Sequence, residues 1–283
     1  VPESAGLHEA HPRLLLITPP NSYRTAAYLA AARRRGIDIL VASEGRHSLV
    51  SELAGGLQVD LDEPSALQDL LEANSRHAFA GVVATDDAVV ELGSRVAGAL
   101  GLPHNPPSAA RYSRRKDLSR QVLADAGVPV PAHRSVRMDA PLESQIASVV
   151  FPCVVKPVAL SGSRGVIRAD NASELLGAIG RVRAILAREY SRESELSTQL
   201  LAETDVRGKK VALEGMLHKG RLAVLAIFDK PDPMEGPFFE ETYYISPSRH
   251  PQVVQEAFSG DVFSAGEPDR SLNSKLIELK TSK

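Results

Sequence analysis

The residues best suited to chemistry lie in the stretch FPCVVKPVALSGSRGV, at 151–166. Lys156 follows a run of apolar, β-branched residues, which predicts a buried strand that carries a lysine. An ammonium group in an interior needs an anionic partner, because an unpaired buried charge is costly. The backbone N–H groups of the Ser-Gly-Ser-Arg-Gly loop could close over phosphate oxygens. Taken alone, the pattern allows two interpretations: a phosphate site, or a plain hairpin whose lysine reaches solvent.

Further charged residues flank this stretch in the sequence. Lys116 opens the amphipathic helix RKDLSRQVLADAG, and the prolines of the following VPVPAHRSV segment predict extended backbone. After the lysine strand, a second apolar strand ends in Glu203, Thr204 and Asp205, and the next strand carries Glu214 within VALEG. Cations and carboxylates are therefore expected on neighbouring strands.

The order of these motifs resembles that of the ATP-grasp superfamily. That family has a lysine on the helix before a GVPVP segment, an FPxVVKP strand, a Gly-rich flap, an acidic hinge strand and a GxxVALEG strand. The later segment at 225–248 looks like the carboxylate–amine ligases that include L-amino-acid ligases, with biotin-carboxylase-like enzymes as cousins. The resemblance covers residues 11 to about 250. Each motif alone is weak, whereas the whole set in the right order is specific.

The resemblance implies a nucleotide site. Lys116 and Lys156 would bind the α- and β-phosphates of ATP as point charges. The flap over the phosphates would consist of Gly162, Ser163, Arg164 and Gly165. The family's hinge glutamate would be Glu203, and the adjacent backbone at Thr204 and Asp205 would read the adenine edge. Glu214 matches a family acid beside the nucleotide, and a solvent-facing strand residue is the equally weighted alternative.

The resemblance also implies contacts with the substrates. Lys230 in FDKP and Glu241 with Thr242 in the EET stretch would lie near the acceptor substrate or the γ-phosphate; Lys230 and Glu241 are the catalytic candidates. An ordinary surface hairpin explains the same residues. Asp86 and Asp87 follow a strand of the N-terminal part, at the end where parallel sheets present ligand contacts. Capping of the next helix accounts for either of them equally well.

Two positions depart from the family pattern. Lys210 stands where the family often has an acid that grips the ribose, and a lysine has no acceptor. The E-x-N triplet that holds Mg²⁺ in the family is missing, since Glu278 is followed by Leu279 and Lys280. Mg²⁺ sites for phosphoryl transfer rely on carboxylates plus phosphate oxygens. We therefore expect a chain without the C-terminal metal-binding part, with metal ligands unassigned and nucleotide binding that could be weak or absent.

The N-terminal part must position one side of such a site. Strands and helices alternate there with short links, which predicts a Rossmann-like parallel sheet covered on both faces. There is no G-x-G-x-x-G, so a dinucleotide site is disfavoured. The expected strands are 13–18, 37–43, 57–63 and 79–87, and the expected helices are 23–36, 64–74 and 88–101.

The rest of the chain predicts an α+β domain. A Pro-rich joint at 104–110 suggests a pre-ATP-grasp domain at 1–108, an incomplete ATP-grasp domain at 109–250 and an atypical tail at 251–283. From about residue 258 this tail is expected to be poorly ordered or loosely docked. The domain should contain antiparallel strands around the lysine loop and a hairpin centred on Lys219 and Gly220. A long helix at 172–196 should open at Ser173, near Asp170 and Asn171.

Composition excludes several other classes. The formal net charge of −2 and the lack of a long basic stripe argue against nucleic-acid binding. No apolar run approaches the length of a membrane span and no signal peptide is visible, so neither a membrane nor export is expected. Cys153 is interpreted as a small core residue, and a single cysteine fits the reducing cytoplasm. The scattered histidines make a zinc site unlikely to form.

The predicted function is therefore an ATP-dependent ligase with Mg²⁺ as its metal. It would form an acyl phosphate from a small-molecule carboxylate and join it to an amine. The alternatives are a non-catalytic or truncated ATP-binding module and a biotin-carboxylase-like enzyme. The acyl and acceptor substrates are not assigned, and a homodimer is left open.

Overall fold

This computed structural model describes residues 12–44, 56–61, 64–191, 194–208, 210–218, 221–232, 235–239 and 243–261. The chain divides into two compact units, Val1–Arg111 and Tyr112–Lys283. The finer limits of 108 and 250 remain predictions. Nowhere in the described ranges is a helix both long and apolar enough to cross a membrane.

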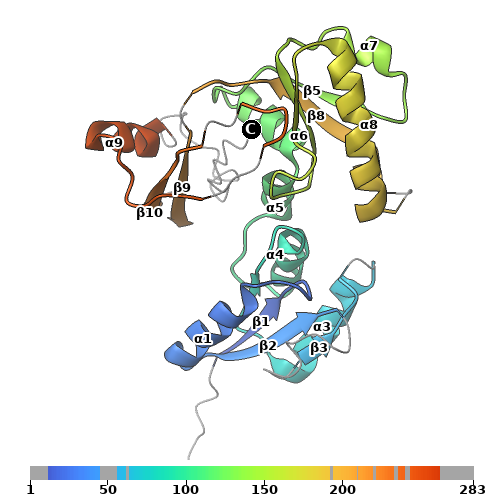
Figure 1. Cartoon of the computed structure of the whole chain (residues 1–283). Helices are drawn as coiled ribbons and strands as arrows, with labels where there is room; N and C mark the ends of the chain where they lie inside the picture. The colour runs from blue at the N-terminus through green and yellow to red at the C-terminus, as the bar shows by residue number, and fades with distance from the viewer. Residues whose placement is uncertain are drawn as a thin grey trace, which may run out of the picture. The chain divides into compact units, whose positions relative to one another are not determined.

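The first unit is built on a four-stranded parallel sheet with the order β3-β2-β1-β4 (Figure 1). Leu15 and Ile17 of the first strand face one apolar core, and Leu16 faces another with Leu29 and Val41, so both faces of the sheet are covered. The predicted Rossmann-like sheet is confirmed. Its strands are β1 Arg13–Ile17, β2 Asp38–Ser43, β3 Gly56–Gln58 and β4 Gly81–Ala84, and its helices are α1 Thr25–Arg35, α3 Ala66–His77 and α4 Val90–Ala99.

The predicted Pro-rich joint is partly helical. Helix α5, Pro107–Arg114, starts with a proline in its first turn, where a missing N–H group has no helical partner to lose. The division between the two units falls within this helix.

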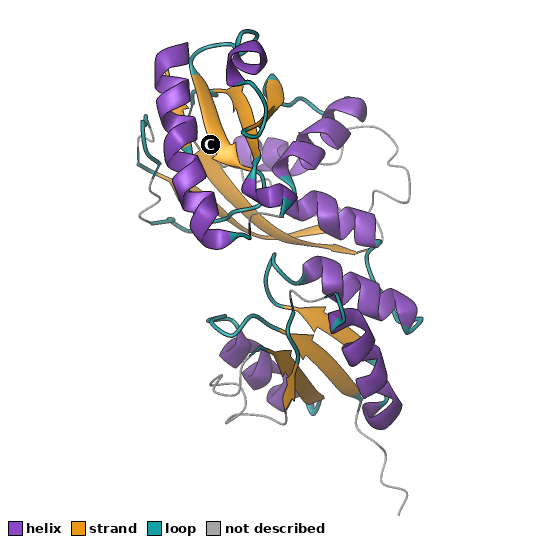
Figure 2. Ribbon diagram, turned by 90° about the vertical axis from the view of Figure 1, so that its right-hand side faces the viewer, coloured by secondary structure: helices purple, strands orange, loops and turns teal. Residues whose placement is uncertain are grey.

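The second unit contains a four-stranded antiparallel sheet with the order β5-β8-β6-β7. The long helix α8 packs on it (Figure 2). The predicted α+β character is therefore confirmed. The strands are β5 His133–Arg137, β6 Cys153–Pro157, β7 Ile167–Ala169 and β8 Gln199–Thr204, and the helices are α6 Lys116–Asp125, α7 Leu142–Ile146, α8 Ala172–Glu189 and the short 3₁₀ helix η1 Glu195–Ser197.

The two faces of this sheet differ in chemistry because successive strand residues point to opposite sides. The face under α8 is apolar and includes Cys153, Val155, Leu200 and Ala202. The alternate positions of the same strands, on the opposite face, are Val154, Lys156, Leu201 and Glu203. The charged residues of β6 and β8 therefore share the face away from α8.

Helix α8 is shorter than predicted and has a different cap. Asn171, not Ser173, is the N-cap: its side-chain oxygen accepts the N–H of Glu174, and a Glu174 carboxylate oxygen accepts the N–H of Asp170. The helix ends at Glu189 instead of 196, because Tyr190 takes extended backbone and packs against the core.

Two long strands form a separate antiparallel ladder. They are β9, Lys210–His218, and β10, Arg221–Lys230, with a bulge between Val224 and Ala226. This pairing confirms a hairpin, whose centre at Lys219 and Gly220 lies outside the described residues. The first part of the predicted atypical tail forms helix α9, Gln252–Asp261. The expectation for the end of the tail stays a prediction, because 262–283 lie outside the described residues.

Candidate functional site

The charged face of the second unit is centred on Glu203. The Lys156 Nζ donates to Glu203 Oε1, and Arg120 Nε donates to Glu203 Oε2 at 3.0 Å. The Lys156 side chain is 0% exposed and that of Glu203 is 5% exposed. Two basic side chains therefore share one buried carboxylate.

The position of Lys156 perturbs its ionisation. Burial lowers the pKa of the Lys156 ammonium from its ordinary value; the charge and hydrogen bond of Glu203 oppose that shift, and Arg120 adds to it. The charged form thus depends on nearby negative charge. A phosphate placed beside Lys156 would supply more of it.

Helix α6 brings a second lysine to the same region. Lys116 and Arg120 lie one turn apart, so they share a face of α6. The Lys116 N–H donates to the Val158 carbonyl at 2.9 Å, and its Nζ donates to the Leu160 carbonyl at 2.5 Å. The structure therefore places Lys116 just beyond β6, at the base of the loop that follows Lys156.

The predicted flap has a strained, tightly turned backbone. Gly162, Ser163 and Gly165 all have positive φ, at 65°, 56° and 74°. A β-carbon on Gly165 would come within 3.0 Å of Pro157 Cγ, so the loop returns closely over the end of β6. Such backbone suits a loop that presents N–H groups to an anion.

Arg164, the remaining flap residue, is held elsewhere. Its guanidinium pairs with Glu189 at 2.9 Å, at the end of α8, and its Nε donates to the Ser161 carbonyl at 3.5 Å. Arg164 is thus not brought together with Lys156 and Glu203 but is tied to the helix on the other face of the sheet.

The residues after Glu203 are engaged within the protein. The Thr204 N–H donates to Ala132, and the Asp205 N–H donates to Pro152 at 3.0 Å. The Asp205 carboxylate lies 3.7 Å from Arg168 Nε of β7. Both N–H groups already have acceptors within the protein. The carbonyl groups of Thr204 and Asp205 therefore carry the prediction that this backbone reads adenine.

The two lysines at the open end of the β9–β10 ladder face one another in register. Lys210 lies with its Nζ 5.8 Å from the Phe239 ring centroid, and the Nζ of Lys230 lies 5.0 Å from the centroid of Tyr244. Phe239 packs against Val154 of β6. Lys210, at the position where the family often has the ribose-binding acid, thus places a cation over an aromatic ring near the charged face.

The other predicted substrate residues are less closely tied to this site. Glu214 is exposed on β9, opposite Ala226. Glu241 and Thr242 lie outside the described residues. In the first unit, Asp86 contacts hydroxyl groups and an arginine instead of capping α4, whose N-cap is Val89; Asp87 is exposed.

Neither thiol chemistry nor a metal centre is built into the described part of the chain. Cys153 is fully buried, which confirms it as a core residue, and burial raises the pKa of its thiol to about 11. No group of three or more His, Cys, Asp or Glu residues that could hold a metal occurs among the described residues.

Sequence reasoning missed Arg120 and Arg168. The signal for Arg120 was its spacing from Lys116, which puts both on one face of α6. Arg168 alternates with the apolar Ile167 and Ala169 on β7, so it could have been assigned to the charged face.

Comparison with known families decides the identity of both parts. Residues 149–262 match the model of an ATP-grasp domain, and residues 29–104 match that of an ATP-grasp N-terminal domain. The chain belongs to the ATP-grasp family.

Individual proteins are similar to this chain in sequence or in fold. The uncharacterized protein y4rH of Sinorhizobium fredii is 32% identical over 155 residues, which cover 53% of this chain and 32% of that protein. The L-amino acid ligase of Bacillus licheniformis has a similar structure, with a TM-score of 0.77 and 24% identity, over 90% of this chain and 61% of the ligase. An ADP complex of N5-carboxyaminoimidazole ribonucleotide synthetase is similar with a TM-score of 0.66 and 15% identity, over 89% of this chain and 62% of the synthetase. The chain thus spans less than two thirds of each of these proteins.

Proposed function

We propose that this ATP-grasp protein acts in the ATP-dependent ligation of a carboxylate to an amine. The carboxylate oxygen attacks the γ-phosphorus of ATP and ADP leaves, which gives an acyl phosphate. The amine then attacks the acyl carbon, phosphate leaves, and the amine loses a proton as the amide forms. The family assignment supports this proposal, and the buried group of Lys156, Arg120 and Glu203 is the observation that carries it.

The charge of that group suits a nucleotide polyphosphate. Lys156 can turn its ammonium to a phosphate oxygen without leaving Glu203 unpaired, because Arg120 holds the other carboxylate oxygen. Lys116, at the base of the positive-φ loop, would hold a neighbouring phosphate. In this mechanism the protein binds, orients and stabilises charge, and it supplies no covalent nucleophile.

Magnesium is the metal that the family implies. The described residues contain no group of three or more His, Cys, Asp or Glu residues that could hold a metal ion by themselves. Mg²⁺ at phosphoryl-transfer sites needs only one or two carboxylates besides the phosphate oxygens, so its protein ligands are left unassigned. The small-molecule carboxylate and amine substrates, a cytoplasmic location and a homodimer also belong to the proposal.

Nucleotide binding is the first test. Calorimetry with ADP, in the presence and absence of Mg²⁺, should show binding by the wild-type chain. Lys156→Met removes the ammonium and leaves Glu203 paired with Arg120, so the fold should persist and ADP affinity should fall by about tenfold or more. The control is Arg188→Met on the exposed face of α8. Absence of ADP binding, or equal binding by Lys156→Met, would contradict the proposed site.

Ligation is the second test. The chain is incubated with ATP, Mg²⁺ and mixtures of L-amino acids, phosphate release is followed, and products are identified by mass spectrometry. Amino-acid-dependent phosphate release with an amide product is expected. ATP use that requires bicarbonate and biotin instead would favour the carboxylase-like alternative.

A non-catalytic nucleotide-binding module is the second candidate. The absence of a cluster of three or more possible metal ligands among the described residues favours it. ADP binding that is insensitive to Mg²⁺, without phosphate release for any substrate mixture, would decide for this candidate.

A further inference from the structure

The first unit has a second polar site at the point where its strand order reverses. From β1 the chain builds β2 and β3 on one side, and it returns to add β4 on the other side of β1. In open parallel sheets, ligands bind outside the carboxyl ends of the strands at such a reversal. Here the two loops at that point are 18–24, after β1, and 85–89, after β4.

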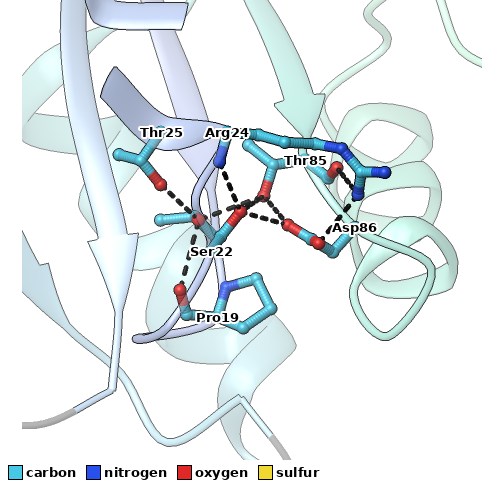
Figure 3. Close-up of polar contacts among 7 residues, drawn as sticks. Pro19, Ser22, Arg24, Thr25, Thr85 and Asp86 are labelled. Carbon is cyan, nitrogen blue, oxygen red and sulfur yellow. Dashed lines mark hydrogen bonds and ion pairs between the residues drawn. The ribbon is translucent and has the colours of Figure 1, made fainter. Parts of the chain in front are cut away.

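Side chains from both loops meet on Asp86 (Figure 3). Its Oδ2 accepts the hydroxyls of Ser22 and Thr85, each at 2.5 Å, and its Oδ1 accepts an N–H of Arg24 at 2.9 Å. The same Arg24 nitrogen lies 3.4 Å from the Thr85 carbonyl. Asp86 therefore joins the two loops and fixes one end of the arginine.

A buried layer of hydroxyl groups supports this arrangement. Thr18 and Thr25 are hydrogen-bonded at 2.8 Å, and the Thr85 hydroxyl lies 3.0 Å from that of Thr18. All three are buried. Such a network holds Asp86 and Arg24 in one geometry, as a binding site requires.

Arg24 itself is only partly used by these contacts. A guanidinium has five N–H donors, and the contacts with Asp86 and Thr85 both involve the same terminal nitrogen. Figure 3 shows the other terminal nitrogen directed away from Asp86. The guanidinium carbon lies 5.0 Å from the ring centroid of Tyr23, a side chain that is 81% exposed, and the Arg24 side chain is 44% exposed. A fixed guanidinium edge is thus presented beside an exposed aromatic ring.

We propose that Arg24 binds the non-reacting carboxylate of an amino-acid acceptor, with Asp86 as its positioning residue. This inference rests on the proposed ligase function and names one of its substrates. Guanidinium and carboxylate form paired, planar hydrogen bonds, so a fixed arginine edge matches this group. Tyr23 would lie against the apolar part of the acceptor.

A phosphate group fits this site less well than a carboxylate. The charges of Arg24 and Asp86 cancel, which suits a monoanion better than a dianion. The loop after β1 carries Pro19 and Pro20 and no glycine, so it lacks two N–H donors that a phosphate cradle would use.

Ligand-observed NMR titration tests this site on the full chain. The probes are L-alanine, L-leucine and L-phenylalanine, each compared with its amide and with its aminophosphonate analogue. Wild type should bind the amino acids and discriminate against the amides by about tenfold. Binding of no amino acid, equal binding of the amides, or tighter binding of the phosphonates would overturn the proposal.

Variants assign the effect to named residues. Arg24→Gln should weaken amino-acid binding by about tenfold or more, and Arg24→Lys, which keeps the charge but not the planar fork, should restore only part of it. Asp86→Asn should reduce the preference for acid over amide, a ratio that a purely structural role would leave unchanged. The control is Arg34→Gln on the exposed last turn of α1. Wild-type amino-acid binding by Arg24→Gln would overturn the proposal.

ADP binding is measured on the same samples, so that the two hypotheses can fail separately. All of these variants should bind ADP as the wild type does. Retained ADP binding without any response to amino acids overturns the Arg24 site alone. Amino-acid binding that depends on Arg24, in a chain that binds no ADP, supports the Arg24 site and overturns the nucleotide site.

Discussion

The two units each hold a carboxylate against cations, in different surroundings. Glu203 of the second unit is 5% exposed and contacts two cations, Lys156 and Arg120. Asp86 of the first unit is 22% exposed and contacts one cation, Arg24, together with two hydroxyl groups. The first arrangement has two basic side chains on one carboxylate in a buried place, which suits a polyphosphate. The second is neutral overall and partly open, which suits a small zwitterion.

Burial also makes the loss of the two carboxylates unequally costly for stability. Breaking a buried ion pair leaves a charge without water or partner, whereas an exposed pair is replaced by hydration. Because Asp86 also accepts two hydroxyl hydrogen bonds, its contribution to stability should be smaller than that of a buried ion pair and larger than that of a surface pair.

Glu203→Gln should have the largest effect on stability. Lys156 and Arg120 would then face a neutral amide in a buried place, and the second unit should lose about 3–5 kcal/mol. Hydrogen exchange with mass spectrometry on β6 and β8 measures this loss separately from the first unit. The control, Glu143→Gln on the exposed surface of α7, should change stability by less than about 0.5 kcal/mol. A loss below about 1 kcal/mol for Glu203→Gln would contradict the buried-pair interpretation.

Lys156→Met should be milder than Glu203→Gln, although it removes the other half of the same pair. Glu203 keeps Arg120, and the lysine's own burial, which lowers its pKa, no longer opposes folding. A loss of about 1–2 kcal/mol is expected in the same exchange experiment. If Lys156→Met proved as damaging as Glu203→Gln, Arg120 could not be a sufficient partner for the carboxylate.

This asymmetry shows what the sequence could predict at the site. An apolar run ending in Lys156 was enough to predict a lysine on a buried strand, and the acids at the end of a later apolar strand predicted carboxylates on a neighbouring strand. That Lys156 and Glu203 share a face depends on strand register, and the contact of Arg120 depends on how α6 packs on β8. Neither is encoded in local spacing, which is why Glu203 was predicted as the hinge glutamate without its partners.

The fold shows the same division between local and tertiary information. Period-two and helical patterns sufficed for most strands and for α1, α3, α4, α6 and α8, but not for α5, α7 and α9. The start of α8 was misplaced because Asn171 and Ser173 are both good caps, and the hydrogen bonds with Glu174 choose between them. In the first unit, an acid after β4 was visible as Asp86, but its arginine comes from a loop far away in the sequence.

Asp86→Asn should have an intermediate effect, limited to the first unit. The amide oxygen can still accept hydroxyl hydrogen bonds, while the charge that holds Arg24 is lost. A loss of about 1 kcal/mol is expected, measured by hydrogen exchange on β1 and β4. The neighbouring Asp87→Asn, at an exposed position, is the matched control. A loss as large as that of Glu203→Gln would remove the distinction between the two carboxylates.

The contribution of Asp86 should depend on pH in a defined direction. Burial acts to raise its pKa, but the hydrogen bonds from Ser22 and Thr85 and the charge of Arg24 together lower it from 3.8. The folded chain therefore holds this proton less tightly than the unfolded chain, so the stabilisation is present above the unfolded value and is lost as the pH falls through the folded one. The stability difference between wild type and Asp86→Asn in urea should stay constant from about pH 7 to pH 5 and shrink below 3.8. A difference that grew on acidification would contradict the assignment.

Arg164→Gln should have the smallest effect, because its pair with Glu189 is a surface pair, with side chains 50% and 35% exposed. Stability should change by less than about 0.5 kcal/mol. Hydrogen exchange in the loop at 161–166 should nevertheless become faster, since the pair fastens that loop to the end of α8, while β6 stays protected. Arg188→Gln, on the exposed surface of the same helix, should leave exchange in the loop unchanged.

Salt should reproduce the effect of Arg164→Gln. At about 1 M salt the exchange rate of the wild-type loop should approach that of the variant, because screening weakens an exposed pair far more than a buried one. A loop that exchanged equally in both proteins at low salt would show that the backbone turns at Gly162 and Gly165 alone hold it in place.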